Sequence, residues 1–220
     1  MSEFPISSKN KVKRVPKRGQ YDHQTIYDIL DAGFLCHIGF VVDGQPFVIP
    51  TSYGRDGNKI YIHGASTSRM LVNLEKGIPV CLTVTHLDGL VLARSAFHHS
   101  MNYRSAVIFG TAILVEGEEK NWALLQISEQ ILKDRWDESR LPNEKELKAT
   151  SVLMIDIETA SAKIRTGPPS DDKEDYDLPI WAGVVPVKQV WGPPQPDPLM
   201  TQQLPVPDSV QQLLKNQVDE

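Results

Sequence analysis

Two short polar segments, residues 64–69 and 102–105, hold the side chains whose types and spacing are best suited to chemistry. The first reads Gly-Ala-Ser-Thr-Ser-Arg and follows an apolar run that ends at His63. Hydroxyls and a guanidinium at the start of a helix can hold a phosphate, because the first helical amides are free donors and bonds to an anion are strong. Ordinary capping by Ser66 or Thr67, with Arg69 in solvent, is the alternative.

The second segment, Asn102-Tyr103-Arg104-Ser105, places an amide, a phenol, a guanidinium and a hydroxyl where a strand begins. The same side chains also fit an exposed strand end with a solvated charge. His98 and His99 lie just upstream. Adjacent residues point to opposite faces of a strand, and no carboxylate stands beside the pair. We therefore expect no metal site here.

The sequence signatures of common enzyme classes are absent. The chain has no HExxH, no CxxC and no Walker-type Gly-Lys-Ser/Thr sequence. Residues 64–68 come within one residue of the GxSxG nucleophile elbow, but Ser68 stands in place of the second glycine. An elbow also needs a parallel strand–turn–helix unit, and the flanking pattern is that of an antiparallel meander. A serine hydrolase is therefore not expected.

The composition is typical of one globular domain. The 220 residues are 40% hydrophobic, which is enough for an ordinary core. A formal net charge of −5 argues against a dedicated DNA-binding surface, and no apolar run approaches the roughly 18 residues of a membrane span. Cys36 and Cys81 are too few and too scattered for a zinc site or a disulfide framework. With no signal-peptide pattern, we expect a cytoplasmic protein that binds neither nucleic acid nor membrane.

Hydrophobic periodicity and turn residues predict the elements that position the polar segments. A helix is expected from Asp22, its cap, to about Gly33. Strands follow in quick succession, because Asp43-Gly44 and residues 55–58 have turn chemistry between apolar runs. The expected strands are 34–42, 46–53, 59–63, 80–93, 103–115, 152–157 and 162–165, with helices at about 69–77 and 118–136. Six or more antiparallel strands with few helices indicate a mainly β protein with a closed or nearly closed barrel.

Three regions can be distinguished along the chain. Residues 1–20 form a basic N-terminal arm, which we expect to be solvated or folded back on the body. Residues 21–167 carry the periodic pattern of the barrel domain. Residues 168–220 are rich in proline, which removes donors and fixes the backbone, so they cannot be mostly helical. We expect this last segment to be an extended arm that wraps over the barrel as part of the same domain.

Several short motifs, taken in order, resemble the flavin-nucleotide-binding branch of the pyridoxamine 5'-phosphate oxidase-like family. The resemblance covers residues 14–198 and rests on order and spacing, because no single motif is specific. The motifs are Arg18–Asp22, Val48–Tyr53, Tyr61–Ala65, Ser68–Arg69, Asn102–Ser105, Arg165–Pro169 and Trp181–Pro186.

This resemblance implies a split β-barrel and a homodimer that binds FMN near the subunit interface. The implied FMN contacts are Val48, Ile49, Pro50, Thr51 and Tyr53 along the isoalloxazine ring, His63 and Gly64 beside the ribityl chain, Ser66, Ser68 and Arg69 at the phosphate, Asn102, Tyr103, Arg104 and Ser105 as a second polar group that the partner subunit can supply, and Trp181 as a cover.

The implied function is an FMN-dependent oxidoreductase that transfers a hydride or electrons through flavin N5 to or from an unidentified small molecule. His63 is a candidate catalytic residue, and a strand-end histidine bonded to backbone is the alternative. The chain lacks the C-terminal Arg-x-His motif that grips substrate in true pyridoxamine phosphate oxidases, so we do not expect that activity. Two other functions stay open: a flavin-binding protein for storage or sensing, and a haem protein with His98, His99 or His63 as the axial ligand.

Overall fold

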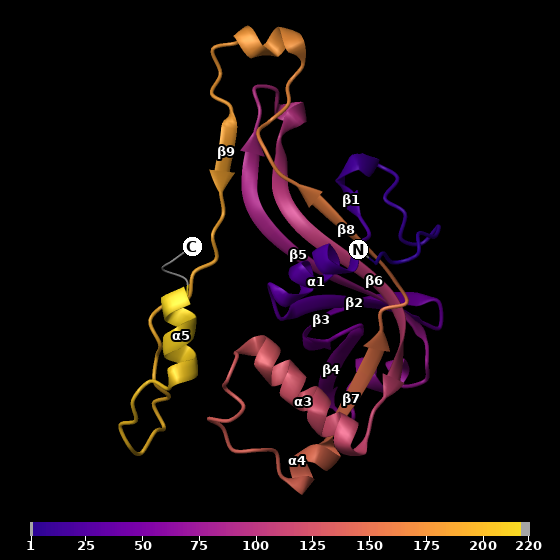
Figure 1. Ribbon diagram of the computed structural model, residues 1–220, viewed down its shortest axis with the longest axis vertical. Coiled ribbons are helices and arrows are strands. Elements are labelled where there is room, and N and C mark those ends of the chain that lie inside the picture. Colours follow the sequence, from indigo (N-terminus) through magenta and orange to yellow (C-terminus); the bar gives the residue numbers. More distant parts are fainter. Residues whose placement is uncertain (1, 217–220) are drawn as a thin grey trace.

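The computed structural model describes residues 2–216 as an antiparallel β-barrel from which a long hairpin and a C-terminal arm extend (Figure 1). The helices are α1 (His23–Asp31), α2 (Arg69–Leu74), α3 (Gly117–Ile131), α4 (Glu144–Ala149) and α5 (Asp208–Asn216). The strands are β1 (Gly19–Gln20), β2 (Leu35–Val42), β3 (Gln45–Asp56), β4 (Lys59–Ala65), β5 (Pro79–Leu92), β6 (Ser100–Leu114), β7 (Thr150–Asp156), β8 (Thr159–Arg165) and β9 (Gly183–Pro186). The short 3-10 turns are η1 (Pro16–Arg18), η2 (Ala96–His98) and η3 (Lys173–Asp177).

The barrel closes through the pairing of β5 with β6. Antiparallel pairs connect the strands in the ring β2–β3–β4–β7–β6–β5, and β5 returns to β2 through residues 37–39 and 81–83. The meander expected from the turn chemistry is present. Asp43 and Gly44 both have positive φ, 50° and 78°, which is the geometry that a two-residue hairpin requires. The expected cap is also present, because Asp22 accepts a hydrogen bond from the Thr25 amide at 2.8 Å.

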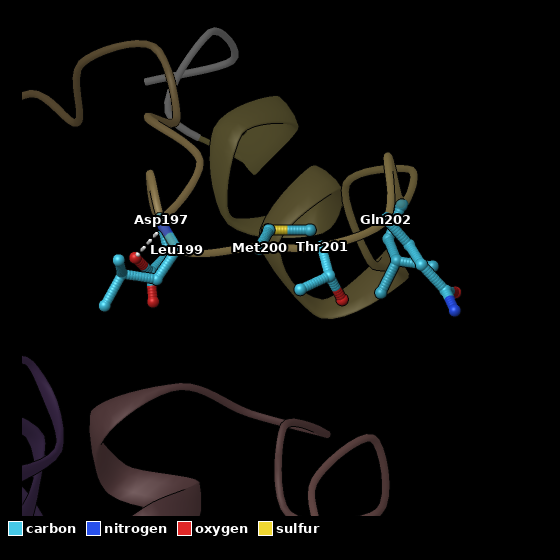
Figure 2. Close-up of a pocket in the computed structure, with 6 residues that line it drawn as sticks. Asp197, Leu199, Met200, Thr201 and Gln202 are labelled. Carbon is cyan, nitrogen blue, oxygen red and sulfur yellow. Dashed lines mark hydrogen bonds between the residues drawn. The ribbon is translucent and has the colours of Figure 1, made fainter.

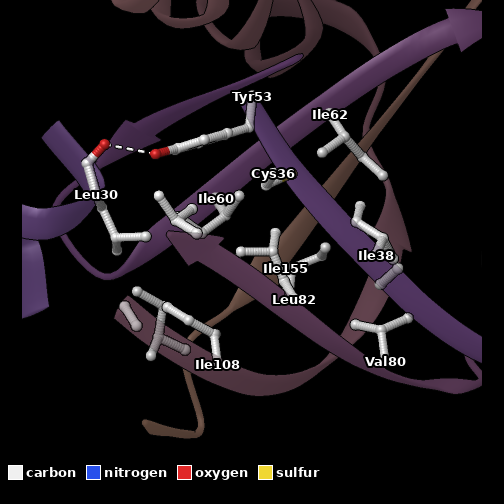
Figure 3. Close-up of a cluster of buried hydrophobic side chains, with 14 of the residues drawn as sticks. Leu30, Cys36, Ile38, Tyr53, Ile60, Ile62, Val80, Leu82, Ile108 and Ile155 are labelled. Atoms are coloured by element: carbon white, nitrogen blue, oxygen red, sulfur yellow. Dashed lines mark hydrogen bonds between the residues drawn. The ribbon is translucent and has the colours of Figure 1, made fainter. Parts of the chain in front are cut away.

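The barrel interior is filled by aliphatic side chains that alternate along its strands (Figure 3). Ile38, Ile60 and Leu82 are completely buried there. Tyr53 is buried among them, and its hydroxyl donates a hydrogen bond to the Leu30 carbonyl at the end of α1 (Figure 3). This bond fixes α1 across one end of the barrel and satisfies a hydroxyl that would otherwise be costly to bury.

The helix α3 packs directly on β3. The two backbones approach so closely that a Cβ at Gly54 would lie 2.5 Å from backbone atoms of Gln126 and Ile127. The helix is shorter than the expected 118–136, because the chain turns extended at Leu132. Trp122 on this helix is half exposed and donates its indole N–H to Asp56 at 2.9 Å.

The N-terminal arm is folded back on the body. Phe4 is buried and stacks on the imidazole of His23 with ring centroids 3.9 Å apart. Asn10 is also buried and donates to the Ala160 carbonyl at 2.8 Å. The strand β1 then extends the sheet beside β8. The lysines of the arm stay at the surface or partly exposed, so only its apolar and amide side chains join the core.

The C-terminal arm runs beside the barrel and leaves most of its side chains exposed, whereas we expected it to wrap over the barrel (Figure 1). It pairs with the outer part of β5 through β9, stacks Trp191 on Phe34 at 6.5 Å, and meets Glu138 through Ser209. Prolines explain the sparse contact, because a segment without amide donors cannot add a continuous strand to a sheet. The arm also forms a shallow hollow of its own, lined by Asp197, Leu199, Met200, Thr201, Gln202 and Leu204 (Figure 2).

We expect Gly54→Ala to lower the free energy of unfolding by about 1–3 kcal/mol, because overpacking a tight contact costs that much. The new methyl would clash with the backbone of α3. Urea denaturation followed by circular dichroism measures the change. Gly192→Ala is the matched control, since a Cβ there meets nothing within 4 Å. Equal stability of the two variants would contradict the close packing of α3 on β3.

Candidate functional site

The strands β3 and β4 pair only between Tyr53–Asp56 and Lys59–Ile62 and then separate. Toward its start, β3 keeps β2 on one edge, and no other strand of the described chain adds to the opposite edge. The predicted contacts Val48–Thr51 lie on this part of β3. Strand edges carry free N–H and C=O groups, which need water or a ligand as partner. The split therefore offers a row of backbone donors and acceptors where the sequence placed a flavin ring.

The end of β4 forms the other side of this split. His63 and Gly64 pair with Val152 and Ser151 on β7 but have no partner on β3. The ring of His63 is largely buried, and its Nδ1 has no hydrogen-bond partner in the described structure. Burial lowers the pKa of His63, so its imidazole is neutral at pH 7. The alternative, a strand-end histidine hydrogen-bonded to the backbone, does not apply to Nδ1.

The hydroxyls ahead of α2 are not used for capping. Ser68 is the N-cap of α2, but its side chain accepts no hydrogen bond from the helix. Arg69 lies 5.8 Å from the ring of Phe47 on β3 and forms no ion pair with the described part of the chain. Phe47 thus links the first residue of α2 to the open part of β3. The structure brings Val48–Thr51, His63, Gly64, Ser66, Ser68 and Arg69 into one neighbourhood.

Tyr53 does not belong to this group. Its side chain is completely buried in the barrel and its hydroxyl is bonded to the Leu30 carbonyl, so it cannot contact a ligand outside the core. Tyr53 lies where β3 is paired with β4, opposite Ile62, whereas Val48–Thr51 lie on the part of β3 that β4 has left.

The polar cluster on β6 is already paired within the chain. Arg104 holds Asp88 through its Nε and Nη2 atoms at 2.9–3.2 Å, and Ser105 donates to the Lys163 carbonyl at 3.3 Å. Asn102 is buried and bonded to Arg165 and to the Gly167 carbonyl. Of the predicted β6 set, only Tyr103 has no such side-chain bond in the described chain.

Within one chain, this cluster is separated from Val48 by three steps between strands around the barrel. Starting at Val48, the sheet register runs through Gly39 and Cys81 to Phe109 on β6. These three steps between strands span roughly 14 Å, and the residues from Phe109 back to Arg104 add about 16 Å along the strand. Trp181 is as remote, because it precedes β9, which pairs with the outer end of β5. Within one subunit, neither the β6 cluster nor Trp181 lies on a strand that pairs with the open part of β3.

Sequence reasoning missed two residues on the outer face of β2. His37 is exposed and pairs through its backbone with Pro50 on β3 and Thr83 on β5. Gly39, two residues on, lies opposite Val48. The alternating pattern of residues 35–42 was a signal for their common face, since side chains two apart in a strand point the same way.

Comparison with known proteins identifies the family. The model described as "Pyridoxamine 5'-phosphate oxidase" matches residues 22–164, well over half of the chain. The chain belongs to this family. The chain is also similar to the solved structure of the flavocytochrome Anf3 of Azotobacter vinelandii, at 40% identity and a TM-score of 0.88, over 96% of this chain and 98% of that one.

A second similar structure, that of the FAD and haem binding protein of Mycobacterium smegmatis, is 35% identical with a TM-score of 0.86, over 89% of this chain and 97% of that one. A 5-nitroimidazole antibiotic resistance protein of Bacteroides thetaiotaomicron, itself described as putative, shares the fold at 24% identity and a TM-score of 0.56, over 65% of this chain and 84% of that one. No curated protein sequence matches the chain. These likenesses establish the split-barrel fold for this member of the family.

Residues 2–216 contain no group of three or more His, Cys, Asp or Glu side chains that could hold a metal ion. Within the same residues, no helix is long and apolar enough to cross a membrane.

The lowered pKa of His63 predicts a pH-dependent part of the stability. The unfolded chain, with an ordinary pKa near 6.5, takes up this proton before the folded protein does. The contribution of His63 to the free energy of unfolding is therefore fully present above pH 6.5. It falls as the pH drops below that value, by about 1.4 kcal/mol per pH unit for one proton. We expect His63→Gln to show a shallower decline between pH 7.5 and 5.5 in urea denaturation. A decline as steep as in the unchanged protein would contradict the buried, neutral imidazole.

Proposed function

We propose that the protein is an oxidoreductase that binds a flavin nucleotide in the split between β3 and β4 and acts on an unidentified small molecule. The observation that carries this proposal is the unpaired edge of β3 at Val48–Thr51 beside the unpaired Arg69. An isoalloxazine ring is flat and apolar with polar atoms along one side, which matches a slot lined by an open strand edge. The flavin supplies hydride and single-electron transfer when bound.

Different residues of the split would bind different parts of the flavin nucleotide. Main-chain N–H groups of β3 would donate to the polar side of the ring. Among the described residues, Ser68 makes no cap bond to α2 and Arg69 forms no ion pair, so with Ser66 they can donate to the phosphate, and bonds to an ionised group are the stronger kind. His63 keeps a neutral imidazole with an unused Nδ1 beside this group, so it can hold or accept a proton there.

The sequence alone led to FMN, and we now favour FAD. The M. smegmatis relative, 35% identical over nearly its whole length, is described as an FAD-binding protein. Both nucleotides present the same ring and a phosphate, so the split fits either one. FAD adds an adenosine phosphate, which needs further contacts beyond Arg69.

Haem is a second group that this family member would carry. Two relatives with high identity and near-complete coverage are described as a flavocytochrome and as an FAD and haem binding protein. This chain has six histidines, the usual axial ligands of haem proteins. Of the three candidates from sequence, His98 lies 3.3 Å from Asp172 and His99 lies 3.2 Å from the Ala93 carbonyl, each through Nε2, which is a common arrangement for a ligand that binds through its other nitrogen, and His63 is largely buried.

We further propose that the protein acts as a homodimer whose cofactor sites are shared between subunits. Tyr103 and Arg104 lie on β6 and Trp181 precedes β9, and neither of these strands pairs with β3 within the described chain. Large apolar side chains are exposed on the outer sheet and the arm, among them Val48 at 68% and Trp181 at 66%. A second copy would cover this surface and bring its β6 cluster to the split.

The absorption spectrum of the freshly purified protein tests the proposal. A flavin envelope, followed by release of FAD on heat denaturation and its identification by chromatography, is the expected result, with a Soret band if haem is present. Bleaching by a reductant and recovery in air with a small-molecule acceptor would support turnover. Bound flavin without turnover would leave a storage or sensing protein. A colourless protein that takes up neither flavin would overturn the proposal.

Arg69→Gln should weaken flavin binding by about 1.5–3 kcal/mol, the usual worth of a bond to a charged group. The measurement is fluorescence quenching of FAD titrated with apoprotein. Lys76→Gln is the matched control, because Lys76 lies just beyond α2 and bonds only to Asn73 among the described residues. Equal flavin affinities of the two variants would show that Arg69 does not bind the phosphate.

Mixed dimers test the shared site. Arg69→Gln and Arg104→Gln homodimers should each bind flavin weakly. Unfolding and refolding the two together should restore tight binding in part of the sites, because each mixed dimer contains one site with both arginines intact. The recovered fraction is read from the flavin titration, and refolding each variant alone is the control. No recovery would place both arginines in one subunit's site or outside it.

A further inference from the structure

Arg165 is the only charged residue among the buried ones in residues 2–216. It is 7% exposed, and the other buried residues are apolar or carry uncharged polar groups. A buried charge is costly unless an opposite charge compensates it. The hydrogen bonds of Arg165 go to the Asn102 side chain and to the Gly167 and Pro168 carbonyls, so no carboxylate of the described chain bonds to it. The end of β8 therefore holds an uncompensated guanidinium.

This guanidinium keeps donors that the chain does not use. Arginine has five N–H donors. Nη1 of Arg165 donates to Asn102 and, at 3.3 Å, to the Gly167 carbonyl, and Nη2 donates once, to the Pro168 carbonyl at 3.3 Å. Nε is buried and has no partner among the described residues. An Nε–H and an Nη2–H are thus left over, and such a pair can hold two oxygens of one anion.

Arg18 adds a second positive charge to the same place. It ends η1 directly before β1, which pairs with β8. Burial and, next to it, the charge of Arg18 hold the pKa of Arg165 below its ordinary value, so the two guanidinium groups are close enough to repel each other. The side chain of Arg18 forms no hydrogen bond or ion pair with any described residue. Two neighbouring cations without a carboxylate favour the binding of an anion.

The N-terminal arm is packed against this region. A Cβ at Gly19 would lie 2.9 Å from the Cβ of Val12, so the arm lies directly on the start of β1. The Val12 amide also donates to the Tyr21 hydroxyl at 2.8 Å. Lys163 pairs with Gly19 and stands two residues before Arg165, so Lys163 and Arg165 share one face of β8. Three cations therefore gather where the basic arm meets the sheet.

We propose that Arg18, Lys163 and Arg165 bind a phosphate group, free or carried by a small molecule, at a site separate from the flavin split. None of the three lies on β3, β4 or α2, which form the split. A phosphate ester carries nearly two negative charges at pH 7, which suits three cations better than the single charge of a carboxylate. The unused donors of Arg165 and the guanidinium of Arg18 hold its oxygens, and the half-exposed Lys163 adds an ammonium at the rim.

The test is a calorimetric titration of the FAD-saturated full chain with inorganic phosphate at constant ionic strength. Arg18→Gln should bind phosphate at least about tenfold more weakly, because it removes a bond between two charged groups. Lys13→Gln is the matched control, since Lys13 is an exposed lysine of the same arm. Arg69→Gln should bind phosphate as the unchanged protein does, which separates this site from the flavin phosphate even if the proposed flavin site fails.

Arg165→Gln gives a second readout, which a merely structural arginine would not change. Urea denaturation is compared in phosphate-free and phosphate buffers of equal ionic strength. Phosphate should stabilise the unchanged protein and leave Arg165→Gln unaffected, so the difference in stability between them should grow with phosphate concentration. A difference that is the same in both buffers would show that Arg165 only holds the chain turn at Gly167 and Pro168, and would overturn the inference.

Adenosine monophosphate in place of inorganic phosphate distinguishes the source of the group. Tighter binding of the nucleotide assigns the site to a phosphate ester, equal binding assigns it to free phosphate, and both support the inference. Phosphate that binds Arg18→Gln and Lys13→Gln equally well, or does not bind the unchanged protein, would overturn it. Binding that occurs only in flavin-free protein would also overturn it, because the three cations would then belong to the flavin site.

Discussion

The separation of β3 from β4 beyond Tyr53 and Ile62 is the constraint on which the rest of the structure depends. A closed ring of strands satisfies its own backbone, so a barrel has no free edge unless two strands part. Here the parting is held open by elements on both sides. The buried bond from Tyr53 to Leu30 fixes β3 to α1, and the close contact at Gly54 fixes it to α3. β4 stays with β7 up to Ala65. Core packing thus keeps the strand edges open, so a ligand does not have to separate β3 from β4 in order to bind.

Charge is distributed to suit the same arrangement. The chain is acidic overall, yet Arg69 beside the split has no carboxylate partner in the described residues, while Arg104 on the hairpin is held by Asp88. An unpaired cation attracts an anion, whereas a paired one mainly keeps a side chain in place. The two arginines looked equivalent in the sequence. Their surroundings give them different roles within one subunit.

The features that neighbouring residues determine could be predicted from the sequence. The Asp43–Gly44 hairpin, the Asp22 cap and the order of the strands all follow from turn residues and alternation, and the structure confirms them. The family motifs also led to the neighbourhood of Val48, His63 and Arg69. What failed depends on contacts between distant residues. The burial of Tyr53, the early end of α3 and the exposure of the C-terminal arm depend on partners that no short window contains. His37 went unnoticed because an exposed histidine has no sequence signature.

The long hairpin of β5 and β6 has a consequence for how this protein can change over time. Both strands run without a break from the barrel wall into the projecting part of the hairpin, with one bulge between Leu87 and Gly89. Side chains alternate along them, so inserting or deleting one residue in one strand would turn every later side chain to the other face. Length changes that keep the pattern must therefore come in pairs of residues or be absorbed at a bulge or in the turn near Ala96. The β5–β6 hairpin is expected to vary in length among relatives in such two-residue steps, while the loop at its tip varies freely.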